Sequence, residues 1–326
     1  MRRNVNRVLA AVAVLVGAAS IERAAKRIES GLRDPLDTRT EAAFKLQRLR
    51  TLRHLGRSPR VLIIGASVLD TDLNPAIIDE QLAIPGASFN ACLVGSDLST
   101  LQSWWKLISS EVDPEVLIVE AHPAMMLPPG TMAAKLTRQL AALTAVVDSE
   151  PQMRRIASRN AFRAGPKALL RAVHSMFARD PEIGVSRSRN RANGYLPAFG
   201  HLDFETGSKR FDGNWYEKVE IDVSGEPLVS EYIEAILEFA ANVKHIMIVV
   251  SPLLLEASAA TIDGISINRK SGDQVLAAAY ERGIPALDLR RIANNVEDFA
   301  DPFHLQFAAA DRCSAVVANS VGELIP

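Results

Sequence analysis

Two short stretches, far apart in the sequence, contain residues that could act together in nucleophilic catalysis. The first is VLIIGAS at 61–67, where four apolar residues run into two small residues and then Ser67. The second is DPFH at 301–304, where His304 follows Asp301 by three residues. A serine nucleophile needs a base within hydrogen-bond reach, and that base needs a carboxylate that orients it. The spacing therefore makes Ser67 a candidate nucleophile, His304 its candidate base and Asp301 the candidate orienting acid.

Each of these residues also fits a purely structural role. Ser67 and Asp70 form the S-x-x-D pattern that often starts a helix, and Asp301 followed by Pro302 is another common helix start. The first stretch lacks the glycine pattern of dinucleotide-binding loops and the Gly-Lys-Ser/Thr of phosphate-binding loops. It also lacks the G-x-S-x-G pattern of α/β-hydrolases, since residue 69 is leucine. Catalysis and helix capping are both open for the serine.

The rest of the chain alternates between apolar runs and helical patterns. Runs rich in Val, Ile and Leu predict strands at 60–65, 87–93, 115–121, 244–251 and 284–289. Amphipathic spacing predicts helices at 74–82, 97–110, 227–242, 270–282 and 305–321. Strands without polar alternation are typical of a parallel sheet buried on both faces. This order indicates a doubly wound α/β fold, in which ligands bind outside the carboxyl ends of the strands.

Residues 124–226 interrupt this order and are predicted to form a largely helical insertion, or cap, over the carboxyl edge of the sheet. Its part 151–191 holds ten Lys or Arg residues against two acidic residues. Such a charge suits anionic lipid headgroups or an acidic glycan, and it equally suits a solvated helical face. The role of this basic segment is open.

The N-terminus predicts a targeting segment. Three arginines precede the apolar run 8–19, which small residues close. This arrangement is typical of a signal peptide or a short signal anchor, although the run is shorter than the roughly 20 residues of a comfortable membrane span. We expect residues 1–28 to be the signal anchor or signal peptide and 29–57 a helical linker. The protein would then be membrane-anchored with its domain outside the cytoplasm, or secreted. A helix packed on the domain is the alternative.

Composition adds a few constraints. The 326-residue chain has a net charge of −1, so its overall charge does not indicate nucleic-acid binding. Cys92 and Cys313 form no metal-like spacing and could make one disulfide or none. No metal-binding or cofactor motif is present, and we expect Asp70 and Asp72 to serve in turns and caps.

Taken together, the Gly-x-Ser after the first predicted strand and the D-P-x-H before the last helix resemble the SGNH/GDSL hydrolase superfamily, from residue 58 to residue 325. The resemblance implies an SGNH-like domain at 58–326 with a flavodoxin-like parallel sheet of five strands. It implies a triad of Ser67, His304 and Asp301. It also implies an oxyanion hole made by the N–H groups of the serine and of Gly95, which follows the second predicted strand.

Two positions depart from the pattern of that superfamily. Ala66 stands where an Asp is usual, and the third predicted strand ends in VEAHPAMM without the Asn that usually donates to the oxyanion. His122 or Asn90 is the candidate replacement for that donor. The loss of one such donor costs about 10²–10³ in rate.

The phrase GASVLDTDLNPAIID is similar to a divergent, often membrane-anchored branch that includes proteins modifying cell-envelope polysaccharides. The resemblance thus implies a serine esterase or O-acyltransferase acting on acyl esters of envelope glycans through an acyl-enzyme, without a cofactor. Expected partners are an acylated carbohydrate or another ester, the membrane through the N-terminal segment, and envelope-assembly proteins. The alternative is a catalytically inactive SGNH-like scaffold that binds a glycan or a membrane partner.

Overall fold

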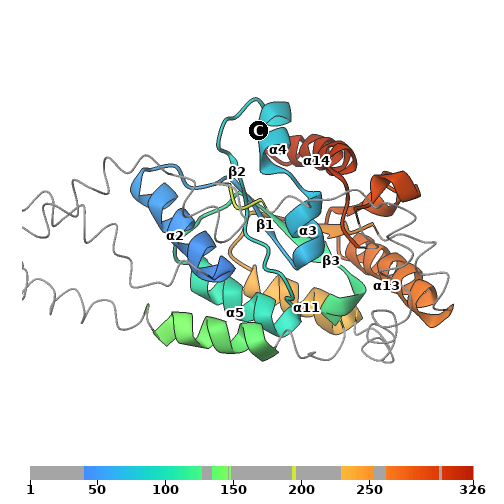
Figure 1. The fold of residues 1–326 in the computed structure, drawn as a ribbon, viewed down its shortest axis with the longest axis horizontal. Helices are drawn as coiled ribbons and strands as arrows, with labels where there is room; N and C mark the ends of the chain where they lie inside the picture. Colours follow the sequence, from blue (N-terminus) through green and yellow to red (C-terminus); the bar gives the residue numbers. More distant parts are fainter. Residues whose placement is uncertain are drawn as a thin grey trace, which may run out of the picture.

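The computed structural model describes residues 40–126, 134–145, 147, 193–195, 229–252, 262–300 and 303–325. These residues build a central five-stranded sheet with helices packed on both of its faces (Figure 1). The strand order is β2-β1-β3-β4-β5, and all four neighbouring pairs are parallel. The doubly wound α/β fold predicted from the sequence is confirmed.

Each strand falls inside a predicted apolar run. β1 and β3 are buried along their whole length, as expected for strands covered on both sides. Side chains alternate between the faces, so Leu62 and Ile64 join one hydrophobic cluster while Val61 and Ile63 join the other. The five strands are β1 (Val61–Ile64), β2 (Ser88–Asn90), β3 (Val116–Ala121), β4 (His245–Val250) and β5 (Ala286–Asp288).

The helices divide between the two faces according to the hydrophobic cluster that each one joins. One cluster takes side chains from α2 (Glu41–His54), α5 (Leu98–Ile108), α11 (Val229–Phe239) and α13 (Ile262–Glu281). The other takes side chains from α3 (Ser67–Asp72), α4 (Pro75–Leu82) and α14 (Phe307–Gly322). Helix α13 begins eight residues before its predicted start at 270. Short 3₁₀ turns are η1 (Pro123–Met126), η3 (Leu289–Arg291) and η4 (Val296–Asp298).

Helix α2 lies in the segment expected to be a linker, and it is packed as part of the domain. Its residues Ala42, Leu46 and Leu49 are buried in the same cluster as α5 and α11. The predicted signal segment at 1–28 lies outside the described residues. Within the part of the chain that the structure describes, no helix is both long enough and apolar enough to cross a membrane.

Beyond η1, two parts of the predicted insertion at 124–226 are described, and both contact the sheet domain. Residues 134–145 are helical, and their leucines join the cluster that contains α5. The tripeptide 193–195 reaches the edge strand β2, where Asn90 N–H donates to Asn193 O at 2.9 Å. Tyr195 is buried there. The basic part at 151–191 lies outside the described residues.

Candidate active site

The candidate site lies where the order in which successive strands join the sheet reverses. From β1 the sheet grows one way to β2 and the other way to β3, β4 and β5. In open α/β sheets this switch point leaves a crevice outside the carboxyl ends of the two central strands. Ser67 follows β1, Glu120 is the penultimate residue of β3 and His122 comes just after that strand, so both strands bring polar side chains to this end of the sheet.

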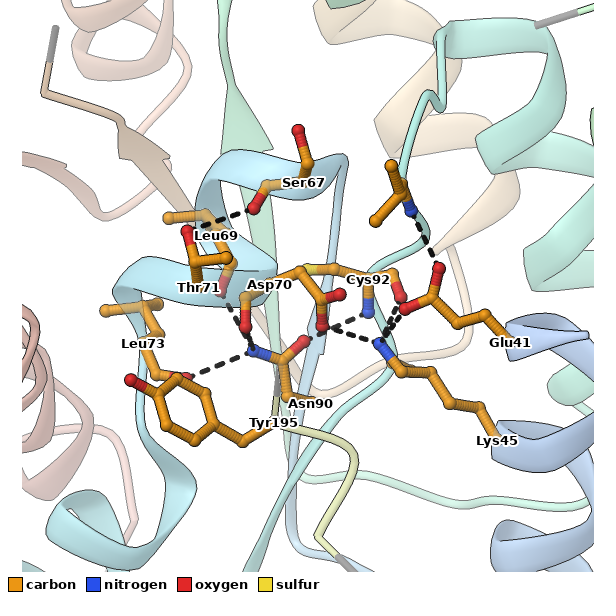
Figure 2. A network of polar contacts seen from close by, with 12 residues as sticks. Glu41, Lys45, Ser67, Leu69, Asp70, Thr71, Leu73, Asn90, Cys92 and Tyr195 are labelled. Carbon is orange, nitrogen blue, oxygen red and sulfur yellow. Dashed lines mark hydrogen bonds and ion pairs between the residues drawn. The ribbon is translucent and has the colours of Figure 1, made fainter. Parts of the chain in front are cut away.

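Ser67 is the first residue of α3, and its side chain does not cap the helix. The N-cap is Ala66, which makes no side-chain cap hydrogen bond. Among the described residues, the Ser67 hydroxyl makes no hydrogen bond, although the Ser67 carbonyl accepts one from Thr71 Oγ1 at 3.2 Å. Figure 2 shows the serine Oγ pointing away from the buried polar network below it. The capping interpretation of the serine is therefore wrong, and its half-buried hydroxyl is available for chemistry.

Glu120 lies directly beneath the turn that carries the serine. It is fully buried, and its Oε2 accepts the N–H of Ala66 at 2.5 Å and that of Leu69 at 3.4 Å. Ser251, which follows β4, donates to Oε1 at 3.4 Å. Burial raises the pKa of Glu120 to about 7, although these hydrogen bonds and the charge of His304 oppose the rise. The sequence signal for this residue is a glutamate inside an otherwise apolar strand.

His304 lies in a loop that the far end of α3 holds in place. Leu305 N–H donates to Asp72 Oδ1 at 2.8 Å, so the last residue of α3 fixes the residue next to His304. An antiparallel bridge between Phe299 and Leu305 closes the loop. Asp301, the predicted orienting acid, lies within this loop but outside the described residues.

Asp298 fixes the base of the same loop. Its Oδ2 accepts the N–H groups of Asn294 and Asn295 at 3.2 and 3.1 Å, and Arg312 of α14 donates to Oδ1. The Asp298 carbonyl accepts Gln306 N–H at 2.8 Å. The D-x-x-H loop is therefore tied to α14 as well as to α3.

His304 lies close enough to Asp72, Glu120 and His122 to act on each of them electrostatically. Its charge lowers the pKa values of Asp72 and Glu120, against the larger opposite effect of burial. Burial lowers the pKa of His122 to about 4, and the charge of His304 lowers it further. His122 is therefore neutral at physiological pH, with one ring N–H that can donate a hydrogen bond. The structure thus brings Ser67, His304 and His122 to one edge of the sheet.

Gly95 lies in the loop that follows β2, beside the serine turn. Leu93 N–H donates to Gly65 O at 2.9 Å, which places the two loops against each other. Gly95 has φ of 80°, a left-handed conformation that favours glycine. Within the described part of the chain, neither its N–H nor that of Ser67 donates a hydrogen bond. Both N–H groups are thus available to bind an oxyanion.

The arrangement around Asn90 does not fit the oxyanion role considered for it. Its Nδ2 donates to Leu69 O at 2.9 Å and to Leu73 O at 3.1 Å, and its Oδ1 accepts Cys92 N–H at 3.1 Å. The side chain is fully buried, and both amide hydrogens are committed to main-chain carbonyls. Asn90 therefore supports α3 and leaves no donor for a substrate.

A buried ionic cluster joins α2 to the candidate site (Figure 2). The ammonium of Lys45 lies 2.5 Å from Asp70 Oδ1, 2.5 Å from Cys92 O and 3.0 Å from Glu41 Oε1. Burial alone would lower the pKa of Lys45, but attraction to Asp70 and Glu41 leaves it above its ordinary value. Glu41 also accepts Val94 N–H at 3.0 Å, next to Gly95. The expectation that Asp70 serves as a cap is wrong, because its carboxylate binds Lys45 instead.

Metal-binding and disulfide chemistry do not appear in the described ranges. No group of three or more His, Cys, Asp or Glu residues there could hold a metal ion. Cys92 and Cys313 are both buried as free thiols.

No known family model and no curated protein sequence matches the chain. Among solved structures, it is similar to a Bacteroides fragilis protein assigned as an acylhydrolase, at 9% identity and a TM-score of 0.43, covering 86% of this chain and 96% of that one. A carbohydrate acetylesterase from Sinorhizobium meliloti shows 10% identity and a TM-score of 0.40, with 82% and 100% covered. An aryl esterase from M. smegmatis shows 11% identity and a TM-score of 0.38, and the match covers 82% of this chain and 100% of the esterase. These similar structures are thus acylhydrolases and esterases.

Proposed function

We propose that the protein is an SGNH/GDSL-like serine esterase or O-acyltransferase that uses Ser67, His304 and Asp301. The observation that carries the proposal is a serine hydroxyl at the start of α3 that makes no hydrogen bond to any described residue, on a helix whose other end holds the His304 loop through Asp72. One short helix would thus position both the proposed nucleophile and the proposed base.

The reaction would proceed in two steps through an acyl-enzyme. His304 takes the proton of the serine hydroxyl as the oxygen attacks an ester carbonyl, and Asp301 orients the imidazole. The N–H groups of Ser67 and Gly95 bind the oxyanion, with the neutral His122 as a further donor. The imidazolium then gives its proton to the leaving alcohol. Water or a sugar hydroxyl attacks the acyl-enzyme, and the same base takes its proton.

The setting of this reaction is part of the proposal. The basic start and apolar run at residues 1–28 support an anchored or secreted protein. The basic segment at 151–191 suits an acidic glycan or anionic lipid surface. Acyl esters of cell-envelope glycans are therefore the proposed substrate class.

Labelling of the full-length chain with a fluorophosphonate probe tests this function. We expect the wild type to be labelled and Ser67→Ala and His304→Ala not to be. Ser103→Ala is the matched control, because Ser103 is exposed on α5 and, among the described residues, its hydroxyl donates only to Ser99 O. An acetyl-ester hydrolysis assay on the same variants should give the same ranking.

The alternative is a non-catalytic scaffold that binds a glycan. Two observations favour it: β3 is not followed by an Asn, and Asn90 has no donor left for an oxyanion. A folded wild type that neither reacts with the probe nor hydrolyses a simple acetyl ester would support the scaffold and refute the esterase.

A further inference from the structure

Glu120 is a buried carboxyl group that the proposed reaction does not use. It is the one charged residue of β3, and none of its surface is exposed. The two N–H groups that it accepts come from Ala66 and Leu69, which flank the serine turn. Burying a carboxyl group destabilises a protein unless hydrogen bonds compensate. Packing alone therefore does not explain a glutamate at this core position.

The glycine before the turn is matched to this carboxyl group. A Cβ at position 65 would overlap the carboxylate oxygen and the Cβ of Glu120. Gly65 is therefore required by the space that Glu120 occupies, and its backbone can lie directly on the carboxyl group. The Gly-Ala-Ser sequence of the turn and the Glu of β3 form one packing unit.

Several titratable groups face this carboxyl group from the elements around it. Asp72 of α3 and Cys92 after β2 lie within its electrostatic reach. Tyr232 of α11 donates its hydroxyl to the main-chain carbonyl of Glu120. His304 approaches from the loop before α14. Because the attraction between two charges is mutual, ionised Glu120 favours the imidazolium form of His304 as much as the imidazolium favours the carboxylate.

Resting on the proposed function, we infer that Glu120 is a positioning residue, which holds the turn carrying Ser67 and whose negative charge supports proton uptake by His304. It contacts neither the substrate nor the reacting atoms. It acts on the serine through the Ala66 and Leu69 N–H groups, and on the base through the electric field. The two actions can be separated, because one needs a hydrogen-bond acceptor and the other needs a charge.

Two variants of the full-length chain separate these actions in rates of fluorophosphonate labelling measured from pH 5 to 9. In Glu120→Gln the amide oxygen can still accept the Ala66 N–H, and the amide N–H can donate to Ser251 Oγ. The substitution removes only the negative charge. We expect the midpoint of its pH profile to move down by less than one unit, because Glu120 has a pKa of about 7 and is only partly ionised near neutral pH. Its plateau rate should fall severalfold, because a weaker base is left. Glu120→Ala removes the acceptor too, and its plateau should fall by at least about tenfold.

Asp79→Asn is the matched control, because Asp79 accepts the N–H of Gly86 in the loop before β2 and that of Ser88 at the start of β2, at the opposite end of the strands. It should leave both the midpoint and the plateau unchanged. A Glu120→Gln protein with the wild-type midpoint and plateau would overturn the inference. If Glu120→Ala does not fold, the comparison of Glu120→Gln with the wild type is sufficient to test the inference. An NMR titration of His304 in these two proteins then measures the effect of the Glu120 charge a second time. A wild type that is never labelled would instead overturn the proposed function.

Discussion

Replacing Lys45 by methionine tests how strongly α2 is held against the candidate site. The ammonium of Lys45 has three donors, and the structure gives it three acceptors at 2.5, 2.5 and 3.0 Å. Methionine has a similar length but no charge and no donor. Lys45→Met therefore leaves the carboxylate of Asp70 buried without its partner, and one of its oxygens already has none among the described residues.

Breaking a buried ion pair from one side costs about 3–5 kcal/mol. That is a large part of the 5–15 kcal/mol that typically separates folded from unfolded protein. For a domain of this size each kcal/mol lowers the melting temperature by about 2–4 °C, so we expect a fall of roughly 6–20 °C. Calorimetry and urea unfolding would both measure it.

The control is Arg53→Met on the exposed side of the same helix. Arg53 lies 3.1 Å from Glu111, but its side chain is 56% exposed, so the loss should stay below about 1 kcal/mol. The double variant Lys45→Met with Asp70→Leu should recover part of the stability, because it removes the stranded carboxylate. A melting temperature of Lys45→Met no lower than that of Arg53→Met would refute the reasoning.

Three further predictions concern the residues beneath the serine turn. Gly65→Ala should cost about 1–3 kcal/mol in urea unfolding by overpacking, whereas Gly322→Ala, whose Cβ would make only an ordinary contact, should cost little. Asn90→Ala removes a side-chain donor from two main-chain carbonyls and the acceptor of one buried N–H, so thermal unfolding should show a loss of about 1–3 kcal/mol, and a Tm equal to the wild type would contradict this. The pKa of Glu120 rises from 4.5 to about 7 on folding, so stability falls as pH rises between these values. Relative to Glu120→Gln, the wild type should lose about 3 kcal/mol between pH 4.5 and 8 in urea titrations, and a pH-independent difference would refute it.

The fold was predictable because its main signal is local. VLII, VLIVEA and HIMIVV are short apolar runs, and each forms a strand buried in the sheet. The start of a helix just after β1 was also predictable. The role of Ser67 at that start was not, because S-x-x-D describes a cap and a displayed nucleophile equally well. Only the structure shows that Ala66 is the N-cap and that Asp70 turns to Lys45.

The supporting residues could not be predicted, because their partners are distant in sequence. Lys45 and Asp70 are 25 residues apart, and Leu305 and Asp72 are 233 apart. From sequence alone, a lysine in a charged helical segment and an aspartate in a turn are both predicted to be exposed to solvent. Glu120 left a signal, since a charge inside an apolar strand needs partners, but the pattern did not say which partners it has.

The tripeptide 193–195 has a consequence for how the molecule meets other copies of itself. A strand at the edge of a sheet presents unpaired N–H and C=O groups on which another chain can add as a further strand. On β2 the N–H of Asn90 is already taken by Asn193, and Gly194 lies so close to the Asn90 carbonyl that a Cβ would overlap it. Three residues returning from the insertion thus occupy the place of a sixth strand. They protect this end of β2 against intermolecular pairing and aggregation.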